Sequence, residues 1–85
     1  MGSHPQRASR LEVQEVEDGF MIHQPERDRV HYLNHTAVLV LELCTGENSP
    51  ARIAELVGAA YGLAETPETE VAAVLEKLRD EGLVE

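Results

Sequence analysis

The pattern of apolar and polar residues has two different periods along the chain. In the first half, short runs of alternating apolar and polar side chains are separated by turn segments at 17–19 and 24–28, which contain glycine or proline. Alternation places successive side chains on opposite faces of a strand. The first half therefore predicts three short antiparallel strands at 11–16, 20–23 and 29–33.

The second half has the helical period of about 3.6 residues, and each predicted helix has signals at its ends. The start signals are Asn34, Ser49-Pro50 and Thr66-Pro67, and the stop signals are Gly46, Gly62 and Gly82. A side-chain oxygen at a helix start accepts an unpaired backbone N–H, and a glycine ends a helix because it tolerates positive φ. A three-stranded antiparallel sheet followed by three helices is a winged-helix-like α+β fold.

The start of the chain differs from the patterned part. Met1-Gly2-Ser3-His4 resembles the remnant of an expression tag, and the polar residues up to Arg10 predict a disordered N-terminus over residues 1–10. Residues 11–85 are expected to form one domain, since a chain of this length supports a single core. No apolar run reaches the roughly 20 residues that span a bilayer. We therefore expect a cytoplasmic protein.

The net charge narrows the range of partners. The whole chain carries −9, and residues 11–85 hold all sixteen acidic side chains but only five of the seven basic ones, which gives −11. Such a surface repels phosphate groups instead of displacing their counterions. The charge therefore argues against binding to nucleic acid or to an anionic membrane and favours a basic or neutral partner.

The sequence shows no pattern of catalytic or metal-binding residues. His23, His31 and His35 are interpreted as polar surface residues, because no cysteine or carboxylate spacing completes a metal site around them. Cys44 is the single cysteine and is expected to be a buried thiol. No motif places a base beside a nucleophile, so we expect no catalytic residue, no metal and no cofactor.

The order of the predicted elements and the residues at their junctions resemble the PqqD family, also called the RiPP recognition element, where RiPP denotes a ribosomally synthesised and modified peptide. The resemblance covers about residues 11–85. It is carried by 29–37 (RVHYLNHTA), 41–46 (LELCTG), Ile53-Ala54 and 78–83 (LRDEGL).

The resemblance implies a non-catalytic adaptor that binds the leader of a precursor peptide. The adaptor then presents the peptide to a modifying enzyme such as a radical SAM enzyme, a cyclase or a leader peptidase. It also implies that the leader pairs with the edge of the third strand and lies against the third helix. The expected peptide-binding residues are Arg29, Val30, His31, Tyr32, Leu33, Glu70, Val74, Lys77 and Leu78. An exposed strand edge is physically suited to this role, since an extended peptide can satisfy its unpaired backbone groups.

Two alternatives stay open at this point. In the third strand either the pair Val30 and Tyr32 or the pair His31 and Leu33 faces the helices, and Leu33 is the better core candidate. The alternative function is a winged-helix DNA-binding regulator. The segment 66–81 argues against that function, because its five acidic residues outnumber its two basic ones.

Overall fold

The computed structural model describes residues 4–85 of the protein. The elements are β1 (Glu12–Val16), β2 (Gly19–Gln24), the short 3₁₀ helix η1 (Pro25–Arg27), β3 (Arg29–Leu33), α1 (His35–Leu43), α2 (Pro50–Tyr61) and α3 (Glu68–Asp80). Three antiparallel strands followed by three helices confirm the predicted α+β fold. The tag interpretation of residues 1–3 lies outside the described residues.

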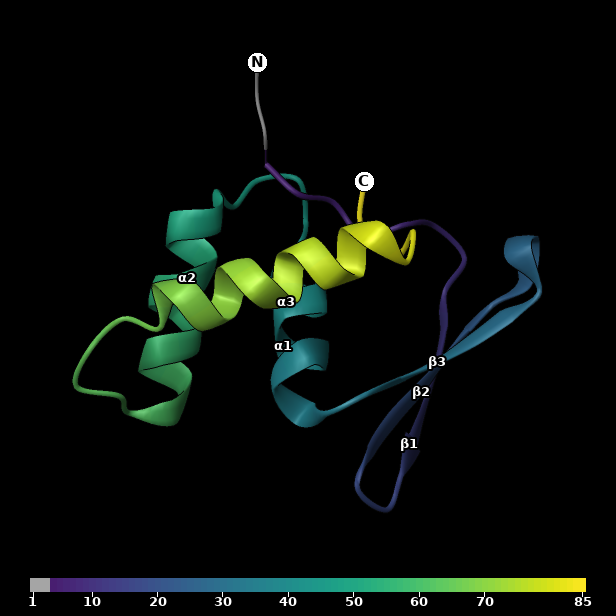
Figure 1. The fold of residues 1–85 in the computed structure, drawn as a ribbon, viewed down its shortest axis with the longest axis horizontal. Coiled ribbons are helices and arrows are strands. Elements are labelled where there is room, and N and C mark those ends of the chain that lie inside the picture. The colour runs from purple at the N-terminus through teal and green to yellow at the C-terminus, as the bar shows by residue number, and fades with distance from the viewer. Residues whose placement is uncertain (1–3) are drawn as a thin grey trace.

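The three strands form one antiparallel sheet in the order β1-β2-β3. The sheet lies to one side of the helices in Figure 1 and twists along its length. In the central strand, Ile22 stands opposite Val13 of β1 and His31 of β3. Ile22 is fully buried. The sheet thus contributes one apolar face to the core and leaves the other face to solvent.

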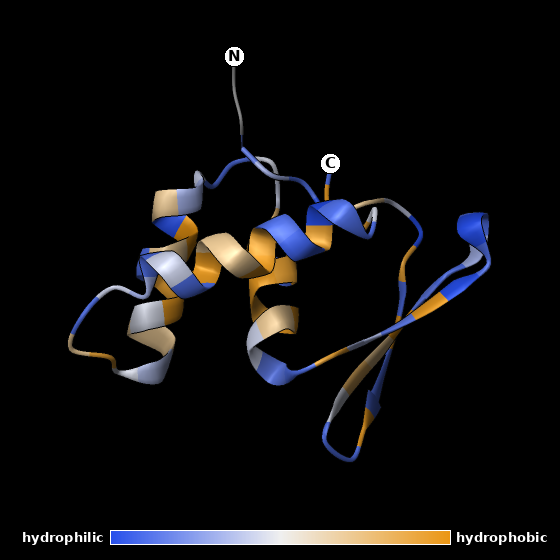
Figure 2. Cartoon of the chain, viewed as in Figure 1, coloured by the Kyte–Doolittle hydropathy of each residue, from blue (hydrophilic) through white to orange (hydrophobic). Residues whose placement is uncertain are grey.

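The three helices supply most of the core. α3 runs across α1 and α2, and α1 also packs against β2 and β3 (Figure 1). Figure 2 shows the apolar residues concentrated along α1 and at the helix crossings, and polar residues at the turns of the sheet. The helical core residues are Val38, Val40, Leu41, Ile53, Ala54, Val57, Val71, Leu75 and Leu78. Within residues 4–85, none of the helices has the length and apolar character needed to cross a membrane.

Two of the three predicted helix starts have the expected cap. The side chains of Asn34 and Ser49 each accept a backbone N–H from the first turn of the following helix, at 2.8 and 3.1 Å. α3 begins one residue later than predicted, because the Thr66 carbonyl accepts the N–H of Glu68 in a tight turn. Pro67 therefore occupies the cap position, where no side chain accepts a hydrogen bond.

The chain after α3 folds back onto the core, as the sequence predicts. Gly82 has a φ of +77°, a conformation that side-chain-bearing residues rarely adopt, and this turn reverses the chain. Leu83 and Val84 are consequently buried among the core residues.

The N-terminal segment differs from the predicted disorder over part of its length. Residues 5–8 run beside the end of the chain, where Ala8 donates its N–H to the Leu83 carbonyl at 2.8 Å and Gln6 accepts from the Glu85 N–H at 2.7 Å. The physical reason is that the returning C-terminal segment has unpaired backbone groups, and an extended neighbour satisfies them. Composition alone does not reveal such a partner.

Candidate functional site

β3 is an edge strand of the sheet. β2 occupies one side of β3, and no other strand within residues 4–85 pairs with the opposite side. Such an edge presents unpaired N–H and C=O groups to an extended chain. The edge is therefore a candidate docking surface.

The register identifies which residues of β3 have these unpaired groups. The turn between β1 and β2 has two residues, so Val16 and Gly19 close the hairpin by exchanging both backbone hydrogen bonds. Bonded and non-bonded pairs alternate along an antiparallel ladder. The even-numbered residues of β2 then bond to the odd-numbered residues of β3. Val30 and Tyr32 consequently direct their N–H and C=O groups away from β2.

The side chains of β3 also divide between two faces, which settles the alternative left open by the sequence. Leu33 is buried in the core, and His31 lies on the same face with only 9% of its side chain exposed. Val30 and Tyr32 lie on the opposite face, 56% and 55% exposed. The interpretation of His31 as a surface residue is therefore wrong, because the alternation of β3 turns this side chain inward with Leu33.

A groove lies between the end of β3 and the face of α3. Its cavity volume is about 300 Å³. The lining residues are Tyr32, Leu33, Asn34, Ala37, Val74, Lys77 and Leu78. The structure thus brings together five of the nine residues that the sequence assigned to peptide binding, from two elements that are more than 30 residues apart in the chain.

The three α3 residues have different positions in this groove. Leu78 is 1% exposed and belongs to the core, so only its outer surface reaches the groove floor. Val74 is half-buried and packs against the core from the groove wall. Lys77 is exposed at the rim. The groove therefore combines an apolar floor and wall with a positive charge at its edge.

Asn34 and Ala37 line the groove but were not expected there. The sequence assigned Asn34 to the helix cap and Ala37 to the core stripe of α1, and both roles are confirmed. Residues with a structural role can also contribute surface to a groove. One sequence signal could have placed these two residues in the groove. They lie at or just after the junction at 33–34, where the predicted edge strand meets the predicted helix.

The remaining expected residues lie elsewhere. Val30 lines a hollow of about 450 Å³ on the solvent face of the sheet, together with Met21 and His23. Glu70 lines a depression of about 470 Å³ with the exposed Tyr61 and Leu63 near the α2–α3 connection. Arg29 and His31 line none of these three surfaces.

Val30, Tyr32 and Met21 form a small apolar strip on the solvent face of the sheet. Met21 stands directly opposite Tyr32, and all three are exposed. The Tyr32 hydroxyl donates to the Asp18 carbonyl at 2.6 Å, which fixes the ring over the β1–β2 turn. A peptide along β3 would therefore meet apolar side chains on both sides of its backbone.

Two histidines near the sheet each contact one other side chain. Within residues 4–85, no group of three or more His, Cys, Asp or Glu side chains is arranged to hold a metal ion. His23 pairs with Glu12 at 3.1 Å, and the His35 ring packs edge-on against Phe20 at 5.3 Å between ring centres.

Cys44 is buried, as predicted. Burial raises the pKa of its thiol to about 11, although the positive charge of Arg79 acts in the opposite direction. The thiol donates to the Val40 carbonyl at 3.1 Å. Because the thiolate is the reactive form, this cysteine is a poor nucleophile near neutral pH.

Comparison with protein families gives a match over residues 19–84 to the family described as coenzyme PQQ synthesis protein D (PqqD). The chain belongs to the PqqD family. The matched region begins at β2 and includes β3, α1, α2 and α3, so it contains the whole groove. β1 lies before the matched region.

A solved structure shares the fold of this PqqD-family chain. It is described as lasso peptide synthetase B1 complexed with the leader peptide. The two chains superimpose with a TM-score of 0.74 at 21% sequence identity, covering 98% of this chain and 99% of the other. At this identity the match establishes the fold that the two chains share. No curated protein matches the sequence.

Proposed function

We propose that this PqqD-family chain binds the leader of a ribosomally made precursor peptide and presents it to a modifying enzyme. The observation that carries the proposal is the free edge of β3 beside a groove walled by α3. Family membership and the shared fold with a protein solved in complex with a leader peptide support the same function.

In this proposal the leader adds a fourth strand to the sheet. The N–H and C=O groups of Val30 and Tyr32 pair with the peptide backbone, and these bonds demand little of the peptide sequence. Specificity comes from side chains that alternate along the bound peptide. Those on one face enter the apolar groove beside Val74 and Leu78, and those on the other contact the strip formed by Met21, Val30 and Tyr32.

The chain acts as an adaptor and carries out no chemistry itself. Its partner enzyme is a radical SAM enzyme, a cyclase or a leader peptidase that acts on the core segment attached to the bound leader. A leader that is disordered when free loses conformational entropy on binding, so affinity stays moderate. We expect a dissociation constant between about nanomolar and micromolar.

The alternative of a DNA-binding regulator is disfavoured by the surface of α3. In a winged-helix protein this helix would need a basic face toward the phosphates. The exposed surface of α3 instead carries Glu68, Glu70, Glu76 and Asp80 against Lys77 and Arg79. The net charge of −9 adds long-range repulsion.

Calorimetry with two synthetic fragments of the precursor encoded beside this protein's gene tests the proposed function. We expect the leader fragment to bind with a dissociation constant of about micromolar or tighter, and the core fragment to give no measurable heat. Equal binding of the two fragments, or binding of neither, would contradict the proposal.

A further inference from the structure

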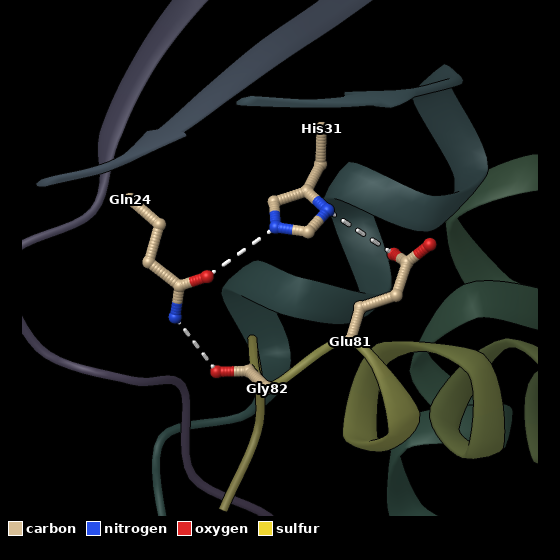
Figure 3. Close-up of polar contacts among 4 residues, drawn as sticks. All are labelled: Gln24, His31, Glu81 and Gly82. Carbon is tan, nitrogen blue, oxygen red and sulfur yellow. Dashed lines mark hydrogen bonds and ion pairs between the residues drawn. The ribbon is translucent and has the colours of Figure 1, made fainter. Parts of the chain in front are cut away.

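A network of polar contacts joins β3 to the end of α3, one helical turn beyond Leu78 (Figure 3). His31 of β3 lies between two partners. Its Nε2 is 3.3 Å from the Gln24 side-chain oxygen, and its Nδ1 is 3.6 Å from Glu81 Oε1. Gln24 in turn donates its amide N–H to the Gly82 carbonyl at 3.0 Å. The contacts therefore connect β2, β3 and the C-terminal end of α3.

The contact with the Gly82 carbonyl determines which ring nitrogen of His31 carries a proton. A carbonyl oxygen only accepts, so the amide nitrogen of Gln24 must face Gly82 and the amide oxygen must face His31. An amide oxygen also only accepts. His31 Nε2 therefore carries a proton, and a neutral His31 ring would be unprotonated at Nδ1.

The Nδ1 side of the His31 ring then has no hydrogen-bond donor unless the ring carries a second proton. Nδ1 faces Glu81 Oε1, and this oxygen is buried without a hydrogen-bond partner among residues 4–85. With a neutral ring and an ionised carboxylate, two acceptors would face each other in a buried place, which is unfavourable for both. A proton between Nδ1 and Oε1 converts the contact into a charge-assisted hydrogen bond.

Among the charged groups near His31, Glu81 is the carboxylate that faces the His31 ring. From β2 the ring meets the uncharged Gln24. Gln24 also borders a depression whose charged lining residues are Glu26, Arg27, Arg79 and Glu85. α1, which packs against β3, has only apolar residues among its buried side chains.

We propose that His31 and Glu81 hold one proton between them, and that this proton fixes β3 against the end of α3 and so sets the shape of the peptide groove. His31, Glu81 and Gln24 are then positioning residues that act through β3, because none of them lines the groove itself. The effect on leader binding rests on the proposed function, whereas the proton link between the two elements does not.

The direction of the pH effect follows from the proton. The folded protein holds this proton through the contact between His31 and Glu81, a contact that the unfolded chain lacks, so the bound proton stabilises the fold at acidic pH. As the pH rises, the proton leaves and two acceptors face each other. Thermal stability and leader affinity should therefore both fall between about pH 5.5 and about pH 8.

Glu81→Gln tests the link, because its amide N–H can donate to an unprotonated Nδ1 and keeps the contact without the extra proton. We expect the parent protein to lose about 4–8 °C in melting temperature and about three- to tenfold in affinity for the synthetic leader between the two pH values. Glu81→Gln should lose much less of either. His23→Gln is the matched control, because it removes the other histidine–carboxylate pair, His23 with Glu12, away from α3. It should keep the parent's pH dependence of melting temperature, which is the property that the control tests.

Two readouts keep the proton link and the proposed function separate. If Glu81→Gln shows the parent's pH dependence in melting temperature, or if the parent shows none, the proton link is wrong. If the leader fails to bind the parent at either pH, the proposed function is wrong, and the melting temperatures still test the link. If the melting temperatures follow the prediction but affinity does not change with pH, His31 and Glu81 do not position the groove.

Discussion

The sheet has two edge strands, β1 and β3, and they differ in charge. β1 carries Glu12 and Glu15, and Glu17 follows in the turn, so carboxylates line this edge. β3 has the sequence Arg-Val-His-Tyr-Leu and contains no carboxylate, and its arginine, Arg29, stands at the first position of the strand. Charged side chains on an edge strand discourage pairing with another chain, because pairing would bring them into a less hydrated place. The composition of the two edges therefore favours β3 for peptide binding.

The two edges also differ in what stands beside them. The end of β3 borders a groove to which α3 contributes Val74, Lys77 and Leu78. β1 is the opposite edge of the sheet, with β2 between it and β3. Backbone hydrogen bonds alone would distinguish poorly between peptide sequences. A groove beside the edge strand can contact the peptide's side chains and so provide specificity. An edge strand is suited to recognition when it lacks carboxylates and has a helix wall next to it.

Proline substitutions at the two edges should have the largest effect. Tyr32→Pro removes an N–H that points away from β2, so we expect leader affinity to fall about tenfold to hundredfold while the sheet stays formed. Val13→Pro removes the equivalent unpaired N–H on β1 and should leave affinity nearly unchanged. Calorimetry on both variants measures the difference.

Two controls make this result interpretable. Tyr32→Ala separates loss of the ring from loss of the N–H, and it should weaken binding less than proline does. Circular dichroism and melting temperature must show that each variant is folded. Equal affinity of folded Tyr32→Pro and the parent would rule out β3 as the docking edge.

A charge reversal on the groove rim should have a smaller effect. Lys77 is exposed, so Lys77→Glu should leave the melting temperature nearly unchanged and lower leader affinity about two- to fivefold. The loss should be larger at about 20 mM salt than at about 500 mM, where charges are screened over a few ångströms.

Arg52→Glu is the matched control for this prediction. Arg52 is an exposed cation on α2, paired with Glu55, and it lines neither β3 nor the groove. Its reversal makes the same change in net charge at another place. If the two variants lose the same affinity, the effect comes from net charge and the peptide does not lie along Lys77.

The sequence predicts most of the fold because local signals and burial agree. Alternation gives all three strands within about one residue of their bounds, and the Asn34 and Ser49 caps place α1 and α2. The returning Leu83 and Val84 are also predicted. The start of α3 is missed by one residue, because the local turn at Thr66 competes with the helix signal at Pro67.

The site is predicted less completely because it depends on packing between distant elements. Helical spacing puts Glu70 and Val74 one turn apart, yet α3 crosses α1 so that the two side chains border different depressions. His31 reads as a polar surface residue until the register of β3 turns it inward toward Glu81. Such placements follow from how the sheet and helices pack, which neither period nor composition encodes.

The most direct test of the central claim is amide hydrogen exchange with and without the synthetic leader. This measurement reports on the unpaired N–H groups of both edge strands, β1 and β3, in the same sample. Leader addition should slow exchange at Val30 and Tyr32, whose amides turn away from β2, and leave Val13 and Glu15 of β1 unchanged. If the leader binds while exchange slows at β1, or stays unchanged at Val30 and Tyr32, the leader does not add a strand to β3.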